Sequence, residues 1–270
     1  MRSTAAQRSR ASDGAIGDPF CSVVAVRDGH HRDLAPAVAR RLAADAQLPV
    51  TVVDVDAKWR DPQPDRDVDR ADRILEIAGG LAGRDGVLVV IDAYGGGPIA
   101  DALFDDTAEH LLTRAGQPIL VIGPGVATPA GRWSLLVPVD SSGPAGGALD
   151  VTLRWSASFG PTPVTVVGLD VPDPWPDDGS GPVADAPRQA AARLRRAGLD
   201  VDLVRRPAGD PSAVLLVVSA TVVGAVLVVP GARSPGSDGH WYATARRLVR
   251  TAPCPVLVVP SREADPGAEL

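Results

Sequence analysis

Two stretches of this chain read alike and decide its fold: residues 108–122 are AEHLLTRAGQPILVI and residues 245–259 are ARRLVRTAPCPVLVV. A shift of 137 residues aligns them without gaps. The identical residues are Ala108, Leu111, Ala115, Pro118, Leu120 and Val121, which match Ala245, Leu248, Ala252, Pro255, Leu257 and Val258. This repeat predicts that the chain consists of two copies of one domain.

Each copy has the pattern of a βαβ unit. An apolar strand, at residues 87–91 or 226–229, precedes a glycine-containing loop, an amphipathic helix and a second apolar strand. Pro118 and Pro255 end the two helices, because proline disfavours the α conformation of the residue before it. Uniformly apolar strands joined by helices are typical of parallel sheets buried on both faces.

The pattern extends upstream in both copies. An apolar strand, at 23–26 or 136–139, leads through a polar loop and a helix to another strand, at 50–55 or 164–169. This order predicts two tandem doubly wound parallel-sheet domains of the α/β class. The expected segments are a disordered tail, a first domain and a second domain, at residues 1–18, 19–125 and 133–262.

The middle sections of the two halves differ in length. The step from Arg27 to Asp92 is 65 residues, whereas the step from Asp140 to Gly231 is 91. The difference is about enough for one strand and one helix with their loops. We therefore expect about four strands in the first half and five in the second. The predicted middle elements are one helix in the first half, and a helix, a strand and a helix in the second, at residues 70–81, 188–197, 201–205 and 211–221.

Composition narrows the class of protein. The net charge is −6 and 45% of residues are hydrophobic, which is typical of a soluble globular protein and argues against a nucleic-acid partner. No apolar run approaches the ~20 residues that span a bilayer, and the polar N-terminus lacks the apolar region of a secretory signal. Cys21 and Cys254 have no neighbours at metal-ligand spacing, so we expect buried, reduced thiols in a cytoplasmic protein and no zinc site.

Ligands of doubly wound sheets bind beyond the carboxyl ends of the strands, where the winding direction reverses. In the second half, this region is flanked by LLVPVDSSGPAGGALDVTLRWSA at 135–157 and VLVVPGARSPGSDGHWYATARRLVRTAPCPVLVVP at 226–260. The first segment resembles the opening strand, aspartate and first helix of the universal stress protein family. The second resembles its closing strand, phosphate loop, helix and last strand. From about residue 21 to 261, the chain resembles a tandem universal stress protein with adenine nucleotide alpha hydrolase-like domains.

The resemblance implies where a nucleotide would bind. Nucleotide-binding members place an aspartate at the end of the first strand and a G-x-x-G-x9-G-S/T loop around the phosphates, because glycines let backbone N–H groups approach the anion. In the first half, Arg27 takes the place of the aspartate, and the loop positions fall on Asp92, Gly95, Asp105 and Asp106.

Carboxylates repel phosphates strongly in a crevice of reduced dielectric, so we predict that the degenerate first domain does not bind ATP. A Mg²⁺ bridge is the alternative. Asp105 and Asp106 are also explained as residues favoured at the start of a helix.

In the second half the nucleotide pattern is mixed. Asp140 is in place and Gly231 holds the first loop position, but Ser234 replaces the second glycine. Tyr242 and Ala243 fall where the Gly-Ser pair is expected. The candidate cofactor-binding residues for ATP or AMP are Asp140, Ser141, Gly231, Arg233, Ser234 and Thr244. The alternatives are a loop that only joins strand to helix, and an aspartate that bonds its own backbone two residues on.

No motif for catalysis or metal binding is visible in the sequence. The histidines have no partners at metal-ligand spacing; they are His30, His31, His110 and His240. Trp59 and Trp175 lie in Pro- and Asp-rich stretches, and they either anchor a partner or cover the edge of a core.

Three functions remain open at this point. The leading hypothesis is a non-catalytic, universal stress protein-like response protein of the cytoplasm, whose domains form an intramolecular pseudo-dimer and act on an unknown protein partner. The alternative is a regulator that binds ATP or AMP in the second domain only, and a slow nucleotide hydrolase is third. Family members commonly pair through their last strands. We therefore predict that strands 119–122 and 256–259 pair within the chain, which hides two sheet edges, with homodimerisation a further option.

Overall fold

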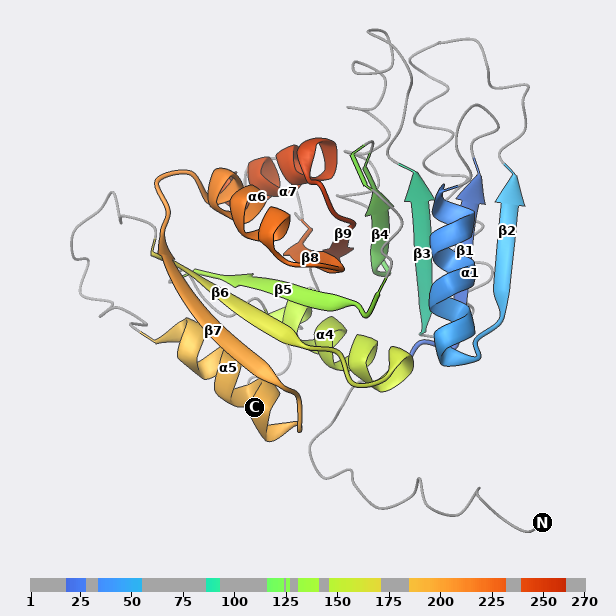
Figure 1. The fold of residues 1–270 in the computed structure, drawn as a ribbon, viewed down its shortest axis with the longest axis horizontal. Helices are drawn as coiled ribbons and strands as arrows, with labels where there is room; N and C mark the ends of the chain where they lie inside the picture. Colours follow the sequence, from blue (N-terminus) through green and yellow to red (C-terminus); the bar gives the residue numbers. More distant parts are fainter. Residues whose placement is uncertain are drawn as a thin grey trace, which may run out of the picture.

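The computed structural model describes strands and helices from both halves of the chain. The described residues are 18–27, 34–54, 86–92, 116–123, 125–126, 131–140, 146–170, 185–231 and 239–260. Their strands form one nine-stranded sheet in the order β2-β1-β3-β4-β9-β8-β5-β6-β7 (Figure 1). The bounds are β1 (Ser22–Arg27), β2 (Val50–Asp54), β3 (Val87–Asp92), β4 (Ile119–Ile122), β5 (Ser134–Val139), β6 (Val164–Asp170), β7 (Val201–Pro207), β8 (Ala225–Pro230) and β9 (Val256–Val259).

Within each half the strands are parallel and the chain winds outward in both directions. β1 lies between β2 and β3, and β5 lies between β6 and β8. This is the doubly wound α/β arrangement that the sequence predicted, and the described residues contain four strands in the first half and five in the second. The additional strand of the second half is β7, which covers the outer edge of β6.

Helices cover both faces of the sheet. α1 (Leu34–Ala46), α4 (Gly146–Phe159) and α5 (Ala186–Arg196) pack on one face, and α6 (Pro211–Thr221) and α7 (Gly239–Thr251) pack on the other. Because the central strands are buried on both faces, they are apolar without alternation. Among the described helices, none has the length and apolar character needed to cross a bilayer.

The ends of two helices follow from local sequence. Asp210 caps α6, and Pro211 fits its first turn because an N–H there has no intrahelical acceptor. Gly198 follows α5 with a φ of 84°, a left-handed conformation that glycine adopts without a Cβ clash. The bounds of α6 are those predicted. α5 begins at Ala186, earlier than predicted, because Pro187 occupies its first turn.

Antiparallel pairing of β4 with β9 joins the two halves of the sheet. Leu120 lies opposite Leu257, with one further pair on each side. Both strands are fully buried. The predicted pairing of the two closing strands within the chain is therefore confirmed. It removes two apolar sheet edges that would otherwise expose unpaired backbone groups.

An aromatic cluster forms a second contact between the halves. The fully buried ring of Trp155 on α4 lies 6.2 Å from the ring of Trp133 and 4.7 Å from that of Phe159, measured between centroids. Phe20, which precedes β1, lies 5.8 Å from Phe159. The guanidinium of Arg41 on α1 lies over the Trp133 ring at 5.4 Å. Phe20 and Arg41 of the first half thus pack in one cluster with aromatic residues of the second half.

The predicted burial of the two cysteines is confirmed for one and wrong for the other. Cys254 is buried as predicted, but Cys21 is exposed. Cys21 precedes the first ladder pair of β1, so its side chain lies at the end of the sheet and not inside it. The predicted helix at 70–81, the loop at 56–69 and the tail up to residue 17 lie outside the described residues.

Candidate functional site

The strand order places one candidate crevice in the second half of the sheet, between β5 and β8. β5 leads to α4 on one face and β8 leads to α7 on the other, so the winding direction reverses between them. Asp140 follows β5 and is only 3% exposed. Gly231 follows β8, is buried, and donates its N–H to the Val259 carbonyl at 2.6 Å. The structure thus brings these two predicted residues to the ends of neighbouring strands.

The hydrogen-bond ladder between β5 and β8 stops short of this crevice. Its last pair is Leu136 opposite Leu227, although β5 continues to Val139 and β8 continues to Pro230. The carboxyl ends of the two strands are therefore not joined by ladder bonds.

Two prolines account for the early end of the ladder. In a parallel sheet, the N–H groups of successive residues point alternately to the two neighbouring strands. The Ser134 N–H donates toward β8, so the nitrogen of Pro138 faces β8 as well. The Leu227 N–H donates toward β9, so the nitrogen of Pro230 faces β5. Neither proline has an N–H to donate, and the two bonds that would continue the ladder are missing.

The corresponding ladder of the first half does not end early. Its ladder between β1 and β3 continues to Val26 opposite Ile91, one residue from the ends of both strands. By strand position, Val26 corresponds to Pro138 and Asp92 corresponds to Pro230. Val26 and Asp92 each carry an N–H group, which the prolines lack. The sequence thus lacks two ladder donors at the strand ends of the second half and keeps them in the first.

Charged groups at the strand ends of the first half bind within the chain. The Asp92 carboxylate accepts the N–H of Ala35, in the first turn of α1, at 3.0 Å. Arg27 Nε and Asp54 Oδ1 form an ion pair at 3.3 Å between the ends of β1 and β2. A carboxylate at a helix N-terminus takes a place that a bound anion would otherwise favour. These contacts favour a first half without an anionic ligand.

Strand register corrects the predicted correspondence between the halves. Val23 pairs with β2 and β3 as Leu135 pairs with β6 and β8. Counting forward, Arg27 corresponds to Val139, and it is Asp28 that corresponds to Asp140. The sequence alignment was wrong by one residue because uninterrupted apolar runs contain no alternation that would fix the register.

The register changes one position in the comparison of the loops after β3 and β8. The residue that corresponds to Gly231 is Ala93 and not Asp92. Beyond these loops the original shift of 137 residues holds, because Ile119 pairs with Val89 as Val256 pairs with Leu227. The other predicted loop positions of the first half lie outside the described residues: Gly95, Asp105 and Asp106.

The other predicted site residues divide into two groups. Thr244 is on α7 and is 6% exposed, and its helix packs against β8 and β9. Ser141, Arg233 and Ser234 lie outside the described residues. The structure therefore places a buried carboxylate, Asp140, and a buried glycine, Gly231, at the ends of the neighbouring strands β5 and β8.

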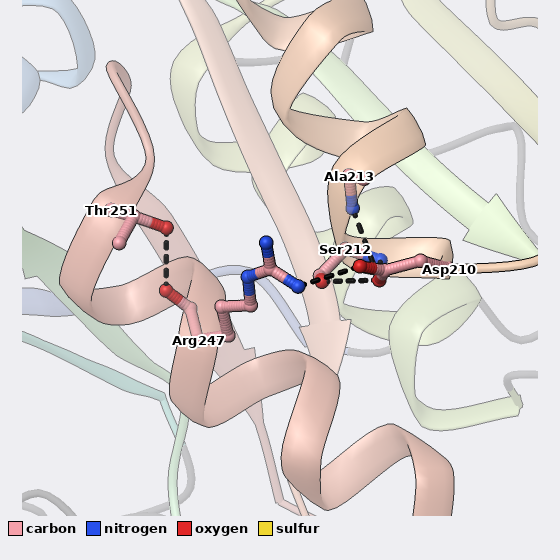
Figure 2. Close-up of polar contacts among 5 residues, drawn as sticks. All are labelled: Asp210, Ser212, Ala213, Arg247 and Thr251. Atoms are coloured by element: carbon pink, nitrogen blue, oxygen red, sulfur yellow. Dashed lines mark hydrogen bonds and ion pairs between the residues drawn. The ribbon is translucent and has the colours of Figure 1, made fainter.

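A polar cluster that sequence reasoning missed ties α6 to α7 (Figure 2). Asp210 Oδ1 accepts the Ser212 N–H at 3.0 Å, the Ser212 hydroxyl at 2.6 Å and the Ala213 N–H at 3.2 Å. Arg247 on α7 donates to Asp210 Oδ2 at 2.6 Å. The Ser212 hydrogen bond, followed by those from Ala213 and Arg247, lowers the pKa of Asp210. The sequence contains a signal for this helix cap, because Asp-Pro-Ser before an apolar run is typical of a helix start.

The thiol of Cys254, in the second half, has low reactivity. Burial raises the pKa of the Cys254 thiol to about 11, and hydrogen bonds from Ser219 and the Leu227 backbone offset only part of this effect. The thiol therefore stays protonated at neutral pH. Within the described part of the chain, no three His, Cys, Asp or Glu side chains gather in a way that could hold a metal ion.

Comparison with known proteins supports the class of the second half. Residues 134–260 match the model of the Universal stress protein family. The match begins at β5 and ends just after β9, so one universal stress protein domain is found there. No curated protein matches the chain.

Solved structures extend the likeness in fold to most of the chain. A universal stress protein from Archaeoglobus fulgidus DSM 4304 is 15% identical, with a TM-score of 0.51 over 88% of this chain and 98% of that one. A Pseudomonas aeruginosa UCBPP-PA14 protein that carries the universal stress protein name is 17% identical, with a TM-score of 0.50 over 88% and 82%. At these identities the likeness establishes the fold, which both halves share with universal stress proteins.

Proposed function

We propose that the chain is a universal stress protein-like, cytoplasmic stress-response protein that acts mainly through contacts with other proteins and not through catalysis. The single observation that carries this proposal is the antiparallel pairing of β4 with β9. Family members commonly pair through their last strands, so the first half would occupy the place of a partner subunit in a pseudo-dimer. In this proposal the first half is a second, degenerate domain of the same family.

A second candidate function is a regulator that binds ATP or AMP through the second half only. The observation that favours it is the early end of the ladder between β5 and β8, where Pro138 and Pro230 lack donors beside the buried Asp140. In this proposal an adenosine group binds at these unpaired strand ends, and its ribose hydroxyls donate to the carboxylate. The corresponding strand ends of the first half are joined by their ladder.

Isothermal titration calorimetry of the full chain with ATP and with AMP, with and without Mg²⁺, distinguishes the two functions. The matched variants are Asp140→Ala, which removes the buried carboxylate, and Asp200→Ala, which removes one negative charge from an exposed turn. Micromolar binding that is lost in Asp140→Ala and kept in Asp200→Ala favours the regulator. No binding up to millimolar nucleotide, in a protein that is folded by circular dichroism, favours the interaction protein.

A further inference from the structure

The strand β7 forms one edge of the sheet in the described part of the chain, with α5 packed on one of its faces (Figure 1). It pairs with β6 over its whole length, from Val201 opposite Val164 to Pro207 opposite Asp170. At seven residues it is longer than β2, the edge at the other end of the sheet, which has five. An edge strand presents a row of backbone N–H and C=O groups that can pair with a further strand. β7 is therefore the longer of the two described templates for such pairing.

The ladder with β6 identifies the backbone groups of β7 that point away from the sheet. The Val164 N–H donates to the Asp200 carbonyl at 2.9 Å, so the backbone of Asp202 is the next to bond β6. Because successive residues alternate in direction, the residues whose backbone groups point outward are Val201, Leu203, Arg205 and Pro207. Arg195 of α5 agrees with this direction, since its Nε and Nη2 atoms donate to the Val201 carbonyl at 3.1 and 2.7 Å.

The two ends of this outward row restrict the register that a second strand can take. The Val201 carbonyl already accepts the Arg195 guanidinium, and Pro207 has no N–H to donate. If two copies of β7 pair antiparallel about a two-fold axis at Val204, these two groups lie opposite each other. The missing donor then meets the acceptor that is already satisfied.

The neighbouring registers fit the same backbone groups less well. An axis at Leu203 would direct the Arg205 N–H of the second copy to the Val201 carbonyl, in competition with Arg195. An axis at Arg205 would leave the Leu203 carbonyl opposite Pro207, without a donor. The axis at Val204 instead joins Leu203 and Arg205 of the two copies by backbone bonds in both directions.

The exposed charges of β7 are complementary in this same register. Asp202 lies opposite Arg206 of the second copy, and by symmetry Arg206 lies opposite Asp202 of that copy. Both residues are exposed, and they occupy pairs without backbone bonds across the contact, where facing side chains are closest. In the single chain Arg206 donates to the Arg205 carbonyl at 3.1 Å, a bond that it would exchange for the carboxylate. A strand of another protein would have to carry matching charges at both positions, whereas β7 supplies them itself.

We infer that the outward edge of β7 is the contact surface for a second copy of this chain, with the two β7 strands antiparallel about a two-fold axis at Val204. An isologous contact of this kind needs a self-complementary surface, and the backbone groups and the charges of β7 meet that need independently. The closing strands are not available to a second copy, because β4 and β9 already pair with each other. The contact requires neither a nucleotide nor another protein, so it can fail while either proposed function holds.

Sedimentation velocity of the full chain over a range of concentrations tests this contact. A strand of seven residues is about 23 Å long, so the contact is narrow, and we expect a monomer–dimer equilibrium in the micromolar range. Asp202→Arg should weaken the dimer roughly tenfold or more, because it brings like charges together twice. Adding Arg206→Asp to that variant exchanges the two charges and should restore the dimer.

The matched control is Asp200→Arg, which makes the same change of charge in the exposed turn before β7 and should leave the dimer as it is. A wild type that is monomeric at every concentration would overturn the inference. So would a dimer that Asp202→Arg does not weaken, or one that the exchanged pair does not restore.

A disulfide at the two-fold axis gives a second readout. In a Cys21→Ser background, which removes the exposed native thiol, Val204→Cys places two thiols in directly facing positions. Facing residues of such a pair have Cα atoms about 4.5 Å apart, which suits a disulfide, so we expect a linked dimer under mild oxidation. Asp200→Cys in the same background lies far from the axis and should remain monomeric. Equal cross-linking of the two variants would contradict the proposed register.

Discussion

At the scale of single residues, Gly224 sets how Arg132 and Trp133, the residues before β5, pack against the sheet. Its φ is 70°, and a Cβ atom at this position would collide with the carbonyl oxygen of Arg132. Its own carbonyl accepts the N–H of Ser134 at 2.9 Å, at the start of the β5 ladder. The position therefore requires glycine for two reasons, a left-handed backbone and a close approach of two chains.

We expect Gly224→Ala to lower the free energy of unfolding by about 3 kcal/mol or more, because the left-handed conformation alone costs about 1–2 kcal/mol and the collision adds to it. Urea unfolding followed by circular dichroism measures this loss. The matched control is Gly160→Ala, since Gly160 has a φ of 82° but nothing within 4 Å of the added Cβ. Equal losses in the two variants would mean that the collision with Arg132 is relieved at no cost.

The cap of α6 predicts a pH dependence of stability. The pKa of Asp210 is lowered in the folded state, chiefly by Ser212, so the carboxylate stabilises the fold above its unfolded-state pKa of 3.8. That contribution is lost as the pH falls through the lower pKa of the folded state. Asp210→Ala should therefore reduce the urea midpoint at pH 7 but much less at pH 3. Asp202→Ala, at an exposed position of β7, is the control; a pH-independent effect of Asp210→Ala would contradict the role assigned to its charge.

The two cysteines should differ sharply in reactivity. Cys21 is exposed, whereas Cys254 is buried with a pKa raised to about 11. At pH 7.5, a thiol-specific reagent such as Ellman's reagent should label one thiol in the native chain and two after denaturation. Cys21→Ser should abolish the native signal. Rapid labelling of two thiols in the native chain would mean that the segment around Cys254 opens easily.

At the scale of secondary-structure elements, the missing donors of Pro138 and Pro230 can be tested by hydrogen exchange after both prolines are replaced. Pro138→Val with Pro230→Val restores two donors, and each new bond contributes about 0.5–1.5 kcal/mol. The loss of proline rigidity in the unfolded chain offsets about 0.4–1 kcal/mol for each substitution, so stability alone is a blunt test. Hydrogen exchange is sharper, because the new amides should exchange nearly as slowly as that of Leu136.

The control for this experiment is Pro161→Val, which introduces an amide in an exposed loop and should exchange quickly. If the amides at 138 and 230 also exchange quickly, the strand ends are held apart by something other than the missing donors.

The elements also show which features the sequence predicted and why others escaped it. The bounds of α6 followed from a local signal, a proline start. The pairing of β4 with β9 followed from the resemblance to universal stress proteins together with two apolar edges. The register between the halves did not, because apolar runs such as those of β1 and β5 have no alternation. The contact of Asp92 with Ala35 joins residues far apart in the chain, and no local pattern reports it. All of the predicted nucleotide-site residues stay predictions, including Asp140, Gly231 and Thr244, whose positions the structure describes.

At the scale of the whole molecule, the aromatic cluster makes the two halves depend on each other. Trp155 is fully buried and touches Trp133 and Phe159, which itself lies against Phe20. We expect Trp155→Ala to cost about 3–5 kcal/mol, as is usual for a large aromatic side chain in a core. Trp155→Phe keeps part of the ring contact and should cost less.

Hydrogen exchange shows whether the stability lost in Trp155→Ala is lost by both halves of the chain. If the halves unfold together, Trp155→Ala should accelerate exchange in both β1 and β6. Acceleration confined to β6 and its neighbours would mean that the first half is stable on its own.

The antiparallel junction of β4 and β9 also sets the direction in which each half faces. Because the strands of the two halves run in opposite directions at this junction, their carboxyl ends lie on opposite sides of the continuous sheet. The crevice beside Asp140 and the strand ends beside Asp92 therefore look away from each other. A molecule held at one side therefore has no direct access to the other.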